Sequence, residues 1–142
     1  MSKNKHNKTV GSAIERSDDR INETGEVFTP MSLCYEMVDE IPDEIMSNPE
    51  STFLDNSAGD GNFPAALIDR LVNKYGHERQ HVLDHMIYVV EYMEDNHAAL
   101  CARLGVPVTH PHYVNADATT YDYSFGEPVG LEAFFGSCYN KL

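Results

Sequence analysis

The stretch Phe53–Leu67, FLDNSAGDGNFPAAL, predicts a strand, a glycine turn and a helix in direct succession. The apolar run Thr52–Leu54 suits a short buried strand, and Asp55 follows at its carboxyl end. Gly59 and Gly61 permit a sharp turn with positive φ and let the backbone approach a ligand closely. Such a unit is typical of α/β proteins that hold a nucleotide-like ligand against the turn.

A helix is predicted upstream of this unit. Thr29 suits an N-cap and Pro30 the first helical position. Leu33, Met37 and Ile41 recur at helical spacing, which predicts an apolar stripe that faces a core.

Downstream, strands and helices continue to alternate. The predicted elements are a helix from Pro64 to a stop at Gly76, a strand Ile87–Val90, a helix 94–104 that ends at Gly105, and a strand His112–Ala116. Short apolar strands that alternate with helices predict a parallel sheet with helices on both faces. Ligands of such sheets bind beyond the carboxyl ends of the strands, where Asp55, Glu91 and Asp117 are predicted to lie.

The residues of the turn restrict the class of ligand. Pro64 replaces the third glycine of a G-x-G-x-x-G motif, and the GK[ST] ending of a phosphate loop is absent. Asp60, inside the turn, disfavours a pyrophosphate. A cationic or zwitterionic ligand whose hydroxyls bind Glu91 fits better, and S-adenosylmethionine has these groups. The alternative is that the three strand-end acids only cap nearby helices.

Four segments in this order resemble the cofactor-binding half of the N6-adenine DNA methyltransferases. They are GEVFTP (25–30), FLDNSAGDGNF (53–63), VVEYMEDN (89–96) and VNADATTYDYSF (114–125). The turn departs from the family pattern by having Asn56-Ser57 where Pro-Ala is usual. The resemblance implies a Rossmann-like class I methyltransferase core, with a partial parallel sheet flanked by helices, and S-adenosyl-L-methionine as the cofactor.

The resemblance also assigns cofactor-binding roles to eleven residues, in groups around the methionine part, the ribose, the adenine and the opening of the pocket. In that order, the residues are Asp55, Gly59, Gly61 and Phe63; Glu91; Tyr92, Met93, Asp117 and Ala118; and Phe28 and Thr29.

The catalytic [N/D/S]-P-P-[Y/F] motif of that family is not found, since the chain has 7 prolines and no Pro-Pro pair. No catalytic residue is therefore assigned, and the isolated chain is expected to be inactive. A protein partner is expected to supply the catalytic and DNA-reading parts, so that DNA is contacted only indirectly. The alternatives are a non-catalytic acidic regulator or DNA mimic that binds a methyltransferase or restriction complex, and a decayed fragment.

Charge supports an indirect role toward DNA. The chain has 10 basic and 23 acidic residues, a net charge of −13, and half of the basic residues precede Ile21. Nucleic-acid binding depends largely on Lys and Arg, so this surface disfavours direct contact with DNA. Such charge also serves solubility or the binding of a basic partner.

The length of 142 residues suits one domain, with residues 1–22 as a flexible polar tail and residues 23–142 as a truncated cofactor-binding domain. No apolar run could span a membrane, and no secretory signal is recognised. Three widely spaced cysteines predict reduced thiols and a cytoplasmic location.

The remaining motifs favour structural roles. His81 and His85 have helical spacing but no third metal ligand, which favours surface histidines and no metal site. The alternation of Tyr121, Tyr123 and Phe125 with polar residues predicts a partly buried edge. The pair Phe134–Phe135, near an incomplete sheet edge, suggests self-association.

Overall fold

The structure is a computed structural model that describes residues 28–127. Its elements are α2 (Met31–Asp39), α3 (Asp43–Ser47), β1 (Phe53–Asp55), α4 (Asn62–Asp69), η1 (Arg70–Lys74), α5 (Arg79–His81), η2 (Val82–Met86), β2 (Ile87–Glu91), α6 (Glu94–Leu104) and β3 (Tyr113–Asn115). The strands form a three-stranded parallel sheet in the order β1-β2-β3. The prediction of an α/β protein with a small parallel sheet flanked by helices is thus confirmed. The predicted tail (1–22), the 25–27 part of the first segment and Phe134–Phe135 lie outside the described residues.

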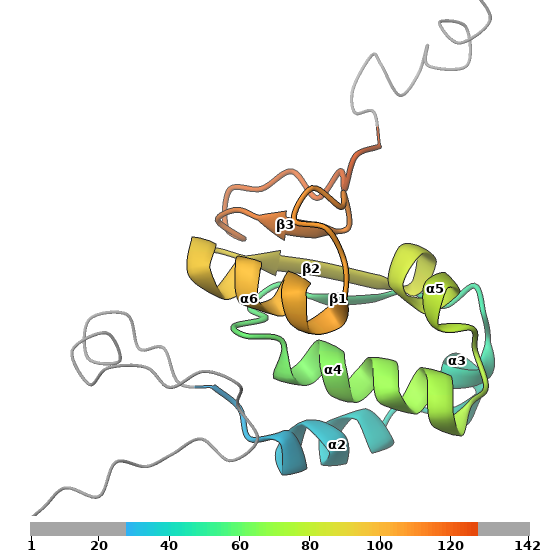
Figure 1. Cartoon of the computed structure of the whole chain (residues 1–142). Coiled ribbons are helices and arrows are strands. Elements are labelled where there is room, and N and C mark those ends of the chain that lie inside the picture. The colour runs from blue at the N-terminus through green and yellow to red at the C-terminus, as the bar shows by residue number, and fades with distance from the viewer. Residues whose placement is uncertain (1–27, 128–142) are drawn as a thin grey trace, which may run out of the picture.

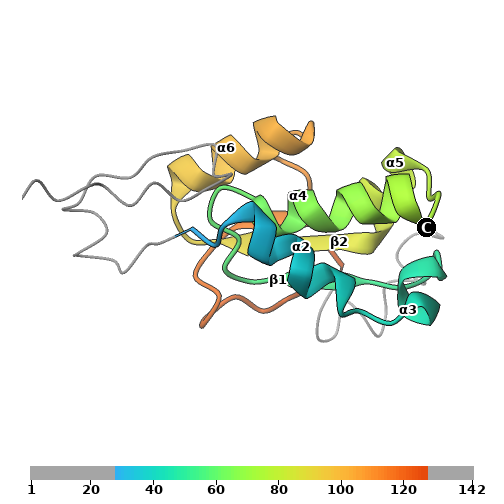
Figure 2. The same cartoon turned by 90° about the horizontal axis from the view of Figure 1, so that it is seen from below.

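The helices α4 and α6 lie on one side of the sheet, and α2 lies next to α4, beyond the β1 edge (Figures 1 and 2). Both strand-to-strand connections run in the same direction along the sheet, and right-handed crossovers then put α4 and α6 on the same face. The helix α2 packs against α4 and so joins this layer. The expectation of helices on both faces is therefore wrong for the described residues.

The core lies between this helical layer and the sheet. Alternate strand residues point to opposite faces, and Ile87, Val89 and Tyr113 are buried on the helical face. In β1, by contrast, Leu54 is 51% exposed on the opposite face. The expectation of a buried first strand is wrong because β1 is at the edge of the described sheet and only Phe53 packs against the core.

Aromatic side chains cover part of the face opposite the helices. The rings of Tyr88 and His112 stack with centroids 4.0 Å apart, and Phe125 meets Tyr88 edge-on at 4.9 Å. The segment after β3 reaches this position through turns, with φ of +56° at Tyr123 and +47° at Phe125. Tyr121, Tyr123 and Phe125 therefore form a folded-back aromatic cluster. The predicted partial burial is confirmed for Tyr121 and Phe125, whereas Tyr123 is 37% exposed.

The buried stripe of α2 differs from the predicted one. Cys34 and Val38 are buried against α4, whereas Leu33 is 44% and Met37 48% exposed. The helix also begins one residue later than predicted, with Pro30 at the N-cap in place of Thr29. This shift follows from tertiary packing, because apolar residues at helical spacing occur on two faces of α2.

Two predicted helix ends are confirmed. Gly76, with φ of +75°, follows the π-helical turn η1, and Gly105, with φ of +77°, ends α6. The helix α4 begins at Asn62, two residues before the predicted start at Pro64. Within residues 28–127, no helix combines the length and apolar character needed to cross a membrane.

The packing of α2 can be tested with two neighbouring residues. Val38→Ala should lower the free energy of unfolding by about 2 kcal/mol, because two buried methyl groups are lost and a cavity remains. Met37→Ala should change it by less than about 0.5 kcal/mol, since Met37 is largely exposed. Urea unfolding of both variants measures the difference. If Met37→Ala lost more free energy of unfolding than Val38→Ala, Met37 would belong to the buried face of α2, as the sequence predicts.

Candidate functional site

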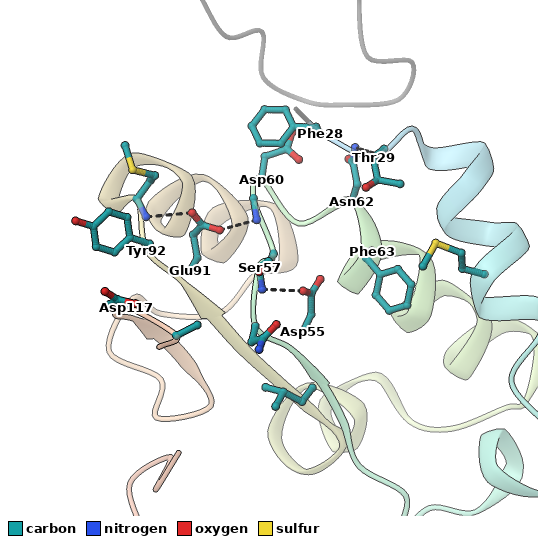
Figure 3. A pocket seen from close by; sticks show the side chains of 17 residues that line it. Phe28, Thr29, Asp55, Ser57, Asp60, Asn62, Phe63, Glu91, Tyr92 and Asp117 are labelled. Atoms are coloured by element: carbon teal, nitrogen blue, oxygen red, sulfur yellow. Dashed lines mark hydrogen bonds between the residues drawn. The ribbon is translucent and has the colours of Figure 1, made fainter. Parts of the chain in front are cut away.

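The turns that follow the three strands meet in one pocket at the carboxyl edge of the sheet (Figure 3). Its volume is about 920 Å³, which is within the usual range for small-molecule sites. Ten of the eleven residues assigned from the sequence line it, namely Phe28, Thr29, Asp55, Gly59, Phe63, Glu91, Tyr92, Met93, Asp117 and Ala118. The topology of the sheet thus brings together segments that are far apart in the sequence.

Gly59 lies directly beneath the ring of Phe28. Its φ is +58°, and a Cβ placed on it would lie 2.8 Å from Cδ1 and 2.9 Å from Cε1 of Phe28. Both the left-handed conformation and the close approach require glycine here. The buried ring of Phe28 therefore covers the turn.

Gly61 does not line the pocket. Its φ is +94°, and a Cβ placed on it would lie 3.1 Å from Cβ of Leu100 in α6. The second glycine therefore shapes the start of α4 and its packing against α6.

Arg103 of α6 connects residues that line the pocket. One of its nitrogens, Nη1, donates to Oδ1 of Asn62 at 2.7 Å, and Nδ2 of Asn62 donates to the Thr29 carbonyl at 2.8 Å. Nη1 also lies 3.9 Å from Oδ1 of the buried Asp60. The charge of Asp60 is thus partly compensated from behind the turn, and this chain of contacts fixes the segment that carries Thr29.

Asp55 faces the pocket from the end of β1. Its Oδ1 accepts from the Ser57 N–H at 3.0 Å. Burial, and secondarily the charge of Glu91, raise the pKa of the Asp55 carboxyl, while the Ser57 hydrogen bond opposes this rise. The charge of Glu91 thus acts on Asp55, and an acidic pair of this kind favours a cationic ligand group.

Glu91, at the end of β2, is buried and connects two turns. Its Oε2 accepts from the Gly59 N–H at 2.6 Å, and its Oε1 accepts from the Met93 N–H at 3.0 Å (Figure 3). Tyr92, between Glu91 and Met93, is 69% exposed at the rim.

Asp117 lies on the exposed rim of the pocket. Its Oδ1 accepts from the N–H of Thr119 at 2.9 Å and from the hydroxyl of Thr119 at 2.6 Å. These hydrogen bonds lower the pKa of the Asp117 carboxyl, so it is charged at neutral pH. A fixed, exposed acceptor at this position is suited to an amino group of a ligand.

Sequence reasoning missed seven lining residues: Met37, Leu54, Asn56, Ser57, Ala58, Asp60 and Asn62. Met37 and Leu54 are exposed apolar residues that the sequence pattern placed in the core, and both contribute an apolar wall. The others belong to the glycine turn itself. Their position in the sequence between Asp55 and Phe63, two residues already assigned to the site, could have identified them.

The lining is strongly acidic. It contains the four carboxylates of Asp55, Asp60, Glu91 and Asp117, while Lys, Arg and His are absent from the described lining residues. A ligand with a phosphate group would find no cationic side chain there. The remainder is apolar or aromatic, which suits a flat base or an aliphatic chain.

Other reactive side chains lie away from the pocket. The Sγ of Cys101 is 3.6 Å from Nε2 of His97, but that nitrogen is also 2.8 Å from the Tyr113 carbonyl and must donate to it. It therefore has no lone pair to accept the thiol proton, and burial raises the pKa of Cys101. The cysteine is structural, although a histidine lies beside it.

No metal-binding group of three or more His, Cys, Asp or Glu side chains occurs within residues 28–127. The rings of His81 and His85 have centroids 5.2 Å apart, and Nε2 of His81 lies 2.8 Å from the Pro49 carbonyl. His85 is exposed.

Comparisons of the chain with protein-family models, with curated proteins and with solved structures gave no match.

The close approach at Gly59 predicts a specific stability loss. Gly59→Ala should cost about 3 kcal/mol, from a left-handed alanine (roughly 1–2 kcal/mol) and from overpacking against Phe28. Gly105→Ala is the matched control, because its φ is +77° and nothing lies within 4 Å of an added Cβ. In urea unfolding, Gly105→Ala should lose only the free energy that a left-handed alanine costs, without the overpacking contribution. Equal losses, or no recovery when Phe28→Ala is added to Gly59→Ala, would contradict the contact.

The environment of Asp55 predicts an unusual pH dependence. Its pKa in the folded state is raised, so the folded state binds the proton more tightly than the unfolded state, and the charged form lowers stability at neutral pH. Asp55→Asn should therefore raise Tm at pH 7, and the gain should disappear as the pH falls below the unfolded-state pKa. Asp122→Asn should lower Tm at pH 7, because the Ser124 N–H lowers the pKa of Asp122. Thermal unfolding between pH 3 and 8 measures the Tm of both variants. Tm changes of the same sign at pH 7 would contradict the opposite pKa shifts of Asp55 and Asp122.

Proposed function

We propose that the pocket binds S-adenosyl-L-methionine and that the chain is the cofactor-binding part of an adenine-specific (N6) DNA methyltransferase. The observation that supports this most directly is the convergence of four separate sequence segments on one pocket. The segments that carry Phe28, Gly59, Glu91 and Asp117 were singled out from the sequence for one ligand, and all four residues line that pocket.

The chemistry of the pocket fits this cofactor. A sulfonium and an amino group suit a lining with four carboxylates, a ribose diol suits a carboxylate acceptor, and an adenine suits the aromatic and apolar rim. Four carboxylates, with no basic side chain in the described lining to offset them, argue against dinucleotides and nucleoside triphosphates, because carboxylates repel phosphate groups.

In this proposal the residues of the chain bind and orient the cofactor. Asp55, Gly59 and Phe63 hold the methionine part, and Phe28 shields it from water. Glu91 accepts from the ribose. Tyr92, Met93, Asp117 and Ala118 surround the adenine, and Thr29 flanks the opening. When bound, S-adenosylmethionine supplies a methyl group on a sulfonium.

In this proposal a partner outside these 142 residues completes the enzyme. These residues contain no Pro-Pro pair, so that partner supplies the motif that holds the target amino group in the resembling family. With a net charge of −13, the chain itself is poorly suited to phosphate contacts. DNA would therefore be bound chiefly by the partner, whose basic surface would complement this one.

The charge also favours a second candidate, an acidic regulator or DNA mimic that occupies the DNA-binding surface of a methyltransferase or restriction complex. Competition experiments separate the two: a mimic displaces DNA from the basic enzyme, whereas a cofactor-binding part completes its activity.

Calorimetric titration with S-adenosylmethionine and with its demethylated product tests the proposal. Wild-type protein should bind with a micromolar Kd, and Asp117→Ala should weaken binding about fivefold to tenfold through one lost hydrogen bond. Asp122→Ala is the matched control, since Asp122 accepts from the Ser124 N–H in the same kind of turn and does not line the pocket. A folded wild-type protein that binds neither compound would refute the proposal and leave the acidic surface as the candidate functional feature.

A further inference from the structure

The carboxylate of Glu91 connects two turns that are far apart in the sequence. Its exposed fraction is 6%. Oε2 accepts from the Gly59 N–H at 2.6 Å, across 32 residues of sequence. Oε1 accepts from the Met93 N–H at 3.0 Å and lies 3.4 Å from Nδ2 of Asn96 (Figure 3).

These contacts satisfy a charge that would otherwise be costly to bury. Hydrogen bonds from amides to a carboxylate are shorter and roughly twice as strong as those to a neutral oxygen. The link therefore fixes the Gly59 amide relative to the end of β2. Elsewhere in the turn, Ser57 is held separately by Asp55 at 3.0 Å.

The carboxylate also keeps room for a ligand. A carboxylate has about four acceptor positions, and the three contacts to Gly59, Met93 and Asn96 use three of them. By this count one acceptor position is left for a ligand hydroxyl.

We propose that Glu91 is a positioning residue: it holds the glycine turn in its ligand-binding shape through the Gly59 N–H, in addition to accepting from the ligand. A compound that contacts only the glycine turn then depends on Glu91 without touching it. The ligand part of this inference rests on the proposed function, whereas the link between the two turns does not.

Amide hydrogen exchange measured by NMR tests the link itself. In Glu91→Gln, whose side chain accepts at one end only, the Gly59 amide should exchange about tenfold or more faster than in the wild type. Glu91→Asp keeps the charge but is one methylene shorter, and it should also lose protection at Gly59. The Ser57 amide is the internal control and should not change. Glu94→Gln, which removes an exposed charge at the start of α6, should leave all of these amides unchanged.

Two outcomes would overturn the link. One is unchanged exchange at Gly59 in both Glu91 variants. The other is equal acceleration at Ser57 and Gly59, which would mean that Glu91 stabilises the turn only through general folding.

Binding measurements test the consequence for ligands. S-methylmethionine carries the sulfonium and the amino acid group without a nucleoside. Glu91→Asp, which keeps the charge of the acidic lining, should weaken its binding at least threefold, and that of S-adenosylmethionine by more, because the latter also loses the ribose contact. If only S-adenosylmethionine binding is weakened, Glu91 acts solely on the ribose and the positioning role is wrong. If the wild-type protein binds neither compound, the proposed function fails, while the amide exchange still decides the link.

Discussion

The parallel pairing of β2 with both of its neighbours is the constraint on which the rest of the structure depends. Asp55 pairs in register with Val89, and Glu91 with Asn115, so the carboxyl ends of all three strands lie at one edge of the sheet. Right-handed connections then place α4 and α6 on the same face, where they bury the core residues of the strands. The pocket is formed by the turns that this geometry leaves at the edge.

The acidic residues of the site lower the stability of the folded state through electrostatic repulsion and burial of charge. Two carboxylates, Asp55 and Glu91, lie close enough to influence one another, and burial raises the pKa of Asp55. Backbone N–H groups of Ser57, Gly59 and Met93 offset this cost by donating to them. Charged groups held together at a concave surface are common at binding sites, where stability is given up for the ligand.

Apolar residues at the rim extend the site outward. Met37, Leu54 and Tyr92 come from α2, β1 and the turn after β2, and each is largely exposed while lining the pocket. Leu54 also lies on the face opposite the helices, at the edge strand. Under the proposed function, the part of the enzyme that supplies catalysis would cover this rim, which would explain why apolar side chains are exposed around an otherwise polar pocket.

The sequence by itself determined the order of strands and helices and the glycine stops of α4–η1 and α6, and the family resemblance singled out ten of the residues that line the pocket. The order and the stops depend on local chemistry, namely short apolar runs for strands, helical spacing of apolar residues, and glycine where φ is positive. Tertiary structure decided the rest. Met37 lines the pocket because α4 packs against Cys34 and Val38, Gly61 packs under α6, and Glu91 bonds to Gly59 because β1 and β2 are neighbours. Local sequence could not reveal these contacts, because each depends on the distance between segments that only the folded sheet brings together.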